Sequence, residues 1–130
     1  MITLIKRKGR NPQTGETLYF PRWKRVATVT KTMLAKVMAR GSTYSVGEVE
    51  GITTDFSQHI GDGLLAGNAV YIQGLGTFSL KVSGKPQKSV DDVTVQGATI
   101  EAVLFEPDKE LMQRLVSEQE FQFVALPEKK

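Results

Sequence analysis

Basic side chains gather around one turn-forming stretch near the start of the chain. From Arg7 to Glu16 the sequence reads RKGRNPQTGE. A tight turn needs the glycine, asparagine and proline of this stretch, because these residues supply its backbone angles, but it does not need the basic residues. Guanidinium and ammonium groups bind phosphate oxygens, so the pattern indicates contact with a polyanion. The basic residues that could make this contact are Lys6, Arg7, Lys8, Arg10, Arg22, Lys24 and Arg25.

The charge of the chain is unevenly distributed. Residues 1–25 contain seven basic residues and one acidic residue, a net charge of +6, whereas the other 105 residues contain ten basic and thirteen acidic residues, a net charge of −3. This asymmetry indicates a surface for a polyanion at the N-terminal segment. The alternative is a solvent-exposed edge hairpin whose charges prevent aggregation. Charge alone leaves both interpretations open.

Composition excludes several classes of protein. A chain of 130 residues forms one domain, or one domain with a small appendage. The absence of cysteine excludes disulfides and cysteine-ligated zinc. No apolar run approaches the roughly 18 residues that span a bilayer, and the N-terminus runs from apolar to basic, the reverse of a secretory signal. We therefore expect no membrane contact.

Few residues could support catalysis. His59 is the only histidine and has no cysteine or second histidine nearby, so we expect it to be a polar surface residue. Gly74 and Gly76 lack the third glycine and the following helix of a dinucleotide site. Asp91 and Asp92 are adjacent in a polar stretch and are expected in a loop. The sequence therefore predicts no catalytic residue, metal site or cofactor.

The first half of the chain predicts a two-stranded ribbon and two helices. Residues 2–28 read as two strands around GRNPQTG, with Pro21 marking an edge or a bulge and with Trp23 packed. A helix is expected at about 30–40, with Met33, Leu34, Val37 and Met38 on one face. Ser45 and Glu48 have capping-box spacing and open a second helix that stops at Gly67. The glycines of this helix would allow close approach of another helix; they are Gly47, Gly51, Gly61 and Gly63.

The second half predicts strands at 69–73 and 77–82 joined by a tight reversal, a polar loop, and a further strand over 93–105 with a candidate break at Gly97. A short helix follows, whose buried face would be formed by Leu111, Met112, Leu115 and Val116. A final strand is expected over 120–126, followed by a frayed tail. The order of elements predicts an α+β fold with a helical hairpin and a small antiparallel sheet.

Three segments, in order, resemble the HU/IHF family of bacterial histone-like DNA-binding proteins. VTKTMLAKVMARGSTYSVGEVE resembles the family's opening pair of helices. GNAVYIQGLGTFSL resembles its signature hairpin, with matches at Gly74, Leu75, Gly76 and Phe78. FEPDKELMQRLV is similar to its terminal helix, with matches at Phe105, Pro107 and Leu111.

This resemblance implies an intertwined homodimer or heterodimer in the bacterial nucleoid, and therefore in the cytoplasm. Helical hairpins would form its base, and an antiparallel sheet would carry β-ribbon arms. In the family, each arm contacts the minor groove of DNA, and a proline at its tip wedges between base steps. The resemblance implies domains at 1–28 (basic hairpin), 29–118 (HU-like core) and 119–130 (strand and tail).

The chain departs from the family in the position of its arm motif. In the family, a segment like RKGRNPQTGE lies between the signature hairpin and the last helix, whereas here it precedes the first helix. The relocated motif adds Asn11 and Pro12, the candidate wedge, to the basic residues expected to bind duplex DNA. The family's own arm position holds a weaker second candidate with three lysines, Lys81, Lys85 and Lys88.

Two functions from different classes follow. The first is an architectural DNA-binding protein that is largely independent of sequence, since phosphate contacts and DNA deformability need no base-edge code. The second is an HU-type scaffold that recruits a protein partner, which the acidic balance of residues 26–130 favours. RNA is a further alternative that the sequence does not separate from DNA.

Overall fold

The computed structural model of the protein describes residues 1–124. The end of the predicted final strand and the tail, residues 125–130, lie outside the described residues. The chain divides into two compact units, one formed by residues 1–30 together with the segment from Leu115 onward, and the other by Lys31–Arg114.

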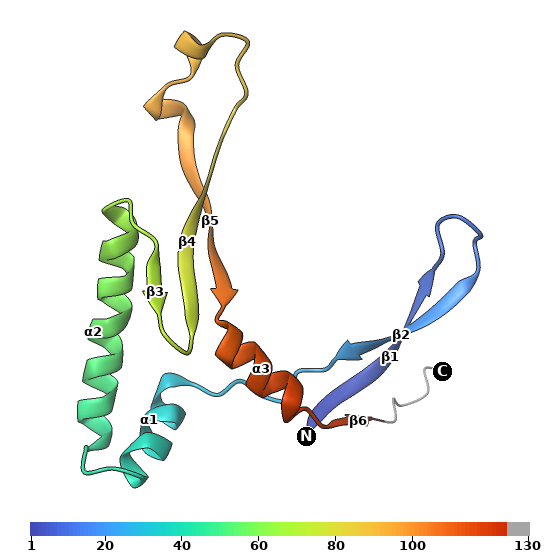
Figure 1. Ribbon diagram of the computed structural model, residues 1–130, viewed down its shortest axis with the longest axis vertical. Coiled ribbons are helices and arrows are strands. Elements are labelled where there is room, and N and C mark those ends of the chain that lie inside the picture. The colour runs from blue at the N-terminus through green and yellow to red at the C-terminus, as the bar shows by residue number, and fades with distance from the viewer. Residues whose placement is uncertain (125–130) are drawn as a thin grey trace. The chain divides into compact units, whose positions relative to one another are not determined.

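The first unit is a three-stranded sheet around a β-ribbon (Figure 1). Strands β1 (Ile2–Arg10) and β2 (Thr17–Trp23) pair in antiparallel fashion. Strand β6 (Phe121–Phe123) pairs in parallel with β1, which gives the order β2-β1-β6. Pro21 therefore lies on an edge strand, as the sequence predicts, but the second strand ends at Trp23 and does not continue to 28.

The helices of the second unit begin and end close to the predicted positions. Helix α1 spans Lys31–Arg40 and helix α2 spans Val46–Leu65. The capping box is confirmed: the amide of Glu48 donates to Ser45 Oγ at 3.0 Å, and the amide of Ser45 donates to Glu48 Oε1 at 3.3 Å. After α2, Gly67 adopts a φ of +90°, a left-handed conformation that favours glycine.

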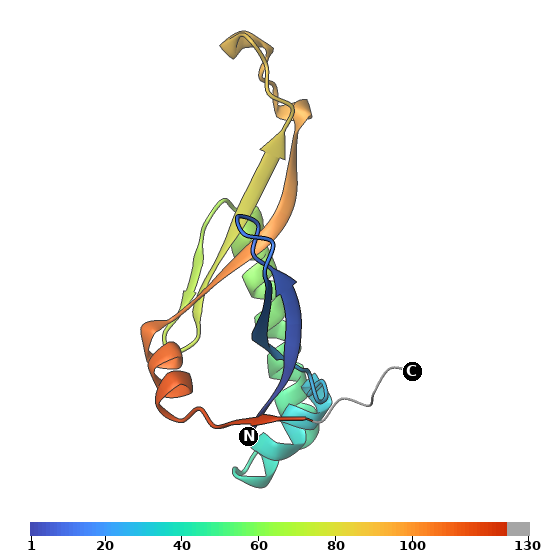
Figure 2. The ribbon, with the colours of Figure 1, turned by 90° about the vertical axis from the view of Figure 1, so that its right-hand side faces the viewer.

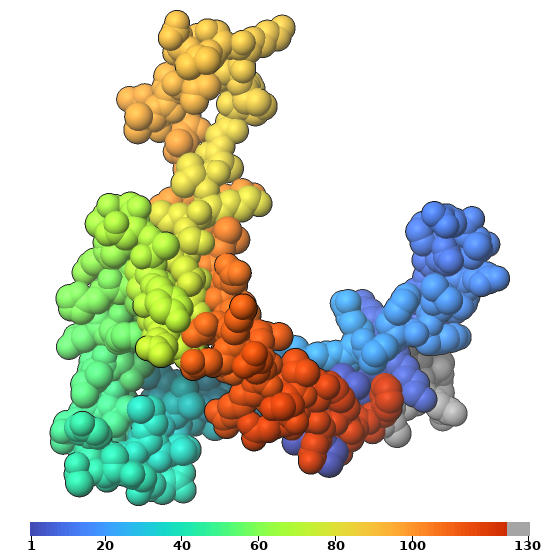
Figure 3. Space-filling model, in the orientation of Figure 1, coloured from blue at the N-terminus to red at the C-terminus, as the bar shows by residue number. Residues whose placement is uncertain are grey.

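The sheet of the second unit carries a long β-ribbon. Strands β3 (Val70–Ile72), β4 (Gly76–Gly84) and β5 (Ala98–Pro107) are antiparallel, in the order β3-β4-β5. The β4–β5 pair extends beyond β3, and its tip projects away from the helices of the same unit (Figures 1 and 3). We call this pair and its tip loop, residues 76–107, the β4–β5 arm.

The prediction of a strand over 93–105 is wrong for residues 93–97, whereas the candidate break at Gly97 is confirmed. Two short 3₁₀ turns, Val90–Asp92 and Val95–Gly97, form the tip, and β5 begins only at Ala98. β-branched valines favour a strand, but here no strand lies opposite them, so the turns satisfy the local backbone groups instead: the amide of Val93 donates to the Val90 carbonyl at 3.1 Å.

The short β3–β4 turn is fixed by Asp108, which precedes helix α3 (Lys109–Ser117). Its carboxylate accepts hydrogen bonds from the amide of Gly74 at 2.8 Å and from the Tyr71 hydroxyl at 3.2 Å. Its second oxygen accepts from the amide of Lys109 at 2.9 Å, which caps the start of α3. The Gly74 amide, followed by these other donors, holds the pKa of Asp108 below its usual value despite partial desolvation.

Few residues are buried within a single chain. Among the described residues, the apolar core consists of Ala35, Val49 and Leu64. The prediction that one face of α3 is buried is wrong for the single chain, because Met112, Leu115 and Val116 are exposed. The apolar face of α1 is likewise exposed.

The expected close approach to the α2 glycines is also not seen within the chain. At Gly47, Gly51 and Gly61, a Cβ atom would have no heavy atom of another element within 4 Å, and only Gly63 faces another element, the Val70 side chain of β3. Helix α2 packs mainly against α1 and the strands β3 and β4, and of its four glycines only Gly63 lies at one of these contacts, with a strand and not with a helix.

Candidate nucleic-acid interface

Strand pairing sorts the basic residues of the ribbon onto two faces. Directly paired residues of neighbouring strands share a face, and alternate residues along a strand share it too. Lys8 pairs with Tyr19, and Leu4 pairs with both Trp23 on β2 and Phe123 on β6. We call this side of the sheet the cationic face; its basic and aromatic residues are Lys6, Lys8, Arg10, Tyr19, Trp23, Phe121 and Phe123.

The opposite face carries Arg7 and Arg22 and is the better packed of the two. Arg7 pairs with Phe20, and the Phe20 ring lies directly over Gly9, where a side chain would collide with it. This contact explains why a residue without a Cβ stands within the strand. Phe20 is 46% exposed, whereas Trp23 on the cationic face is 64% exposed, so the expectation that Trp23 is packed is wrong.

The RNPQTG turn is held by its own hydrogen bonds. The amide of Gln13 donates to Asn11 Oδ1 at 2.9 Å, and the amide of Gly15 donates to the Asn11 carbonyl at 2.8 Å. Gly15 has a φ of +73°, which favours glycine. Asn11 is therefore engaged in shaping the turn, and Pro12 is exposed beside it.

The basic residues of the segment 1–25 are not neutralised by acids among the described residues. Within residues 1–124, none of its seven lysines and arginines forms an ion pair with a carboxylate. Two of them lie against aromatic rings instead: Lys6 Nζ is 5.2 Å from the centre of the Phe123 ring, and the Arg25 guanidinium is 5.9 Å from that of Trp23. These cation–π contacts leave the charge available to a phosphate.

The β4–β5 arm is a weaker electrostatic candidate. Lys81 lies 3.6 Å from the carboxylate of Glu101 across the ribbon. Lys85 and Lys88 belong to the tip loop, which also carries Asp91 and Asp92. The arm contains three lysines and four acidic residues, a net charge of −1. Its charge therefore does not favour a polyanion, although it occupies the position of the family's arm.

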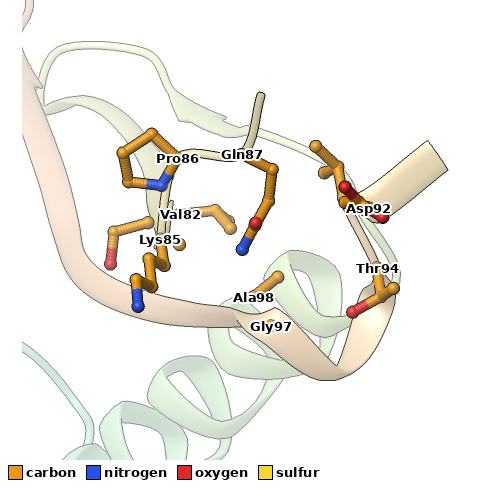
Figure 4. Close-up of a pocket in the computed structure, with 11 residues that line it drawn as sticks. Val82, Lys85, Pro86, Gln87, Asp92, Thr94, Gly97 and Ala98 are labelled. Atoms are coloured by element: carbon orange, nitrogen blue, oxygen red, sulfur yellow. The ribbon is translucent and has the colours of Figure 1, made fainter. Parts of the chain in front are cut away.

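The base of this tip loop is hollowed. A cavity of about 370 Å³ is lined by Val82, Lys85, Pro86, Asp92 and Ala98, among others (Figure 4). Lysine and aspartate side chains both line it, so it offers no single charge to a ligand. Pro86, the only proline of the tip loop, is one of the residues that line this cavity.

Other candidate sites receive no support from the described residues. His59 is exposed, with Nδ1 3.9 Å from the Asp62 carboxylate. In the part of the chain that the structure describes, no group of three histidine, cysteine or acidic side chains could hold a metal ion. Over the same residues, no helix has the length and hydrophobicity needed to cross a bilayer.

The sequence alone does not bring the rings of the cationic face together with its cations. Alternation along β2 could have placed Tyr19 on the same side as Trp23, but only the register with β1 brings Lys8 beside Tyr19. Phe121 and Phe123 join this face through a pairing between segments 119 residues apart in the chain, for which no local pattern exists.

The chain is similar in sequence to known proteins. Over residues 3–122 the chain matches the family described as an HU domain fused to a wHTH, Ig or glycine-rich motif. It is 31% identical over 87 residues to integration host factor subunit beta of Shewanella halifaxensis, an alignment that covers 64% of this chain and 90% of that protein.

A solved structure shares the fold. It is a candidate bacterial DNA-binding protein from Bacteroides vulgatus, with a TM-score of 0.70 and 8% sequence identity. The alignment covers 95% of this chain but 48% of the other, so the chain spans about half the length of that protein. With the α+β architecture and the match over nearly all described residues, the chain belongs to the HU/IHF-related family of HU domains fused to wHTH, Ig or glycine-rich motifs.

Proposed function

We propose that the protein is a non-enzymatic, nucleoid-associated architectural protein that binds duplex DNA through the β1–β2 ribbon. The observation that carries this proposal is the set of seven basic side chains in the first unit, none paired with a carboxylate within residues 1–124. Unpaired cations displace the counterions condensed on DNA, and this release supplies affinity without reference to base sequence.

The relatives support the same class of ligand. The solved structure that shares the fold is named for DNA binding, and the curated relative is a subunit of integration host factor. The RKGRNPQTGE segment resembles the family's arm motif, and here it forms the tip of a two-stranded ribbon.

In the proposed mechanism, residues on both faces of the ribbon contact phosphates. Lys6, Lys8 and Arg10 reach them from the cationic face, and Arg7 and Arg22 from the other, with Lys24 and Arg25 at the base. Pro12, exposed in the turn, wedges between base steps and bends the duplex. Asn11 contributes by holding the turn that presents Pro12. Phosphate contacts and deformability give little sequence preference.

We further propose that the protein acts as a dimer, most simply a homodimer, in the cytoplasmic nucleoid. Helices α1 and α2 expose large apolar side chains that a second HU-type chain would cover; they are Met33, Leu34, Val37, Met38, Ile52 and Phe56. Exposed apolar area of this extent on two adjoining helices favours association.

A scaffold that recruits proteins is the second candidate. The charge balance of the β4–β5 arm favours it, because Lys81 is paired with Glu101 and the arm as a whole carries a net charge of −1. In this alternative, neither ribbon needs to contact DNA.

A matched pair of triple variants tests the proposal. The Arg7→Ala/Lys8→Ala/Arg10→Ala variant and the Lys81→Ala/Lys85→Ala/Lys88→Ala variant lose the same charge from different ribbons. Binding of each to a random-sequence duplex is measured across a salt series. In a plot of the logarithm of the binding constant against the logarithm of the salt concentration, each lost phosphate contact makes the negative slope shallower by about 0.9. The slope of the first variant should therefore be shallower by up to about 2.7 per chain, and the second variant should keep nearly the original slope. Equal slopes for the original protein and the first variant would reject the β1–β2 ribbon; no binding at micromolar protein would favour the scaffold.

A further inference from the structure

We propose that the cationic face also binds the bases of an unpaired polynucleotide strand, by stacking them on Tyr19, Trp23 and the β6 phenylalanines. This inference rests on the proposed function, because the same lysines and arginine would hold the phosphates of the strand. It adds a ligand, single-stranded nucleic acid, and a mode of binding that phosphate contacts alone do not provide.

The register brings rings and cations together on one side of the sheet. Trp23, Leu4 and Phe123 form one row across β2, β1 and β6, and Tyr19 and Lys8 form another. Lys6 lies between these rows, over the Phe123 ring. Neighbouring strands are about 4.8 Å apart and same-face neighbours along a strand about 6.8 Å apart, so each ring has a cation within reach of one nucleotide.

These rings are exposed, although aromatic side chains on a sheet are ordinarily covered. Tyr19 is 69% exposed, Trp23 64% and Phe123 55%. Phe20, on the opposite face, instead packs over Gly9. In Figure 2, the blue strands β1 and β2 extend beyond β6, which pairs only with the start of β1. Tyr19 and Lys8 therefore lie on a part of the sheet that has two strands.

Charge selects the occupant of this face. Three cations, Lys6, Lys8 and Arg10, share it with the rings, and none of its paired positions in β1, β2 or β6 is acidic. An acidic or purely apolar partner would leave either the rings or the cations unmatched. A nucleotide chain offers a phosphate and a flat ring at every repeat, which matches both.

The bases must be unpaired for this contact. In a duplex the faces of the bases are covered by their neighbours, so rings fixed on a sheet can reach only bases that have left the stack. Stacking makes no use of base edges, and the face should therefore accept any sequence. DNA and RNA offer the same chemistry, and separate probes distinguish them.

The only tryptophan of the chain, Trp23, reports on this contact directly. We would titrate the full chain with a 15-nucleotide thymidine strand, with an abasic strand of the same length and charge, with the matching 15-base-pair duplex and with a uridine strand. The thymidine strand should quench the fluorescence of Trp23 and bind about tenfold more tightly than the abasic strand at equal salt. Quenching by the uridine strand would extend the site to RNA, and its absence would restrict the site to DNA, both in support of stacking.

Two variants separate stacking from phosphate binding. Tyr19→Leu should weaken binding of the thymidine strand by about fivefold or more and leave binding of the abasic strand unchanged. The control is Tyr44→Leu, which replaces a tyrosine of the second unit that is 56% exposed. This control should leave binding of the thymidine strand and of the abasic strand unchanged. Circular dichroism checks that both variants fold.

The outcomes that overturn the inference are distinct from those that overturn the proposed function. Equal affinity for the thymidine and abasic strands would end the stacking proposal while leaving phosphate binding intact. Failure of all four probes to bind would end both. A free protein whose Trp23 resists quenching by acrylamide would show that protein already covers this face, and the site would not exist.

Discussion

The carboxylate of Asp108 accepts a hydrogen bond from the backbone amide of Gly74 at 2.8 Å, which joins the start of α3 to the β3–β4 turn. The amide of Asp108 in turn donates to the carbonyl of Leu75 at 3.0 Å. The glycine turn and the terminal helix, two segments of the family resemblance, are therefore parts of one hydrogen-bonded junction. The negative charge of Asp108 makes the stability of this junction sensitive to acid.

Stability should fall with acid because of Asp108. Its pKa in the folded chain lies below the usual value of about 3.9. The stabilisation from the ionised carboxylate is therefore complete above pH 4 to 5, and it is lost as the pH falls through the usual value toward the folded one. Urea unfolding at pH 7 and pH 3 should show a smaller difference between the two pH values for Asp108→Asn. Asp91→Asn at the arm tip is the control and should retain the original difference.

Gly76 should not tolerate a side chain. It has a φ of +155°, and a Cβ there would collide with the Glu106 carbonyl and would lie 2.6 Å from the Phe105 ring. Gly76→Ala should destabilise the second unit by about 1–3 kcal/mol, measured by thermal unfolding. Gly51→Ala, in the middle of α2 with open space around it, should instead stabilise by up to about 1 kcal/mol. Similar effects of the two substitutions would contradict the described packing.

Pro12 should matter more for bending than for affinity. A Pro12→Ala variant keeps every cation of the ribbon and loses only the apolar wedge, so a duplex labelled at both ends should show less energy transfer at saturation, with affinity changed by less than about threefold. Pro86→Ala, at the tip of the other ribbon, serves as the matched control. Reduced bending with Pro86→Ala alone would assign the wedge to the β4–β5 arm.

The exposed face of α1 should hold the proposed dimer together. Leu34 is 53% exposed and Val37 59% exposed in the single chain. A Val37→Glu substitution would place a charge in an apolar interface, where an unpaired charge is costly. Analytical ultracentrifugation should show the mass of one chain for this variant and of two for the original protein. Lys36→Glu, one residue away on α1, reverses a charge at another position and should leave the mass unchanged.

Local chemistry in the sequence predicts most of the elements but few of the contacts between them. Ser45 and Glu48 are three residues apart and suffice to place the start of α2. The RNPQTG turn likewise contains what its hydrogen bonds require. Asp108, by contrast, reads only as an acid near a helix start, because its partner Gly74 is 34 residues away.

The same limit applies to the candidate site. The sequence shows the cations of residues 1–25, since charge needs no partner to be counted. It does not show which rings stand beside them, because the parallel pairing of β6 with β1 depends on the tertiary fold. The predicted burial of the α3 face fails for a related reason: an amphipathic pattern marks a face that can be covered, without naming the chain that covers it.

The pairing of β1 with β6 also bears on synthesis at the ribosome. Thr3 and Gln122, joined by a hydrogen bond of 3.4 Å, are translated 119 codons apart. The nascent ribbon can form its hairpin early, but one edge of β1 stays open until β6 emerges. During that interval the free edge is a template on which another chain could pair, and the density of positive charge on the hairpin would help to keep neighbouring nascent chains apart.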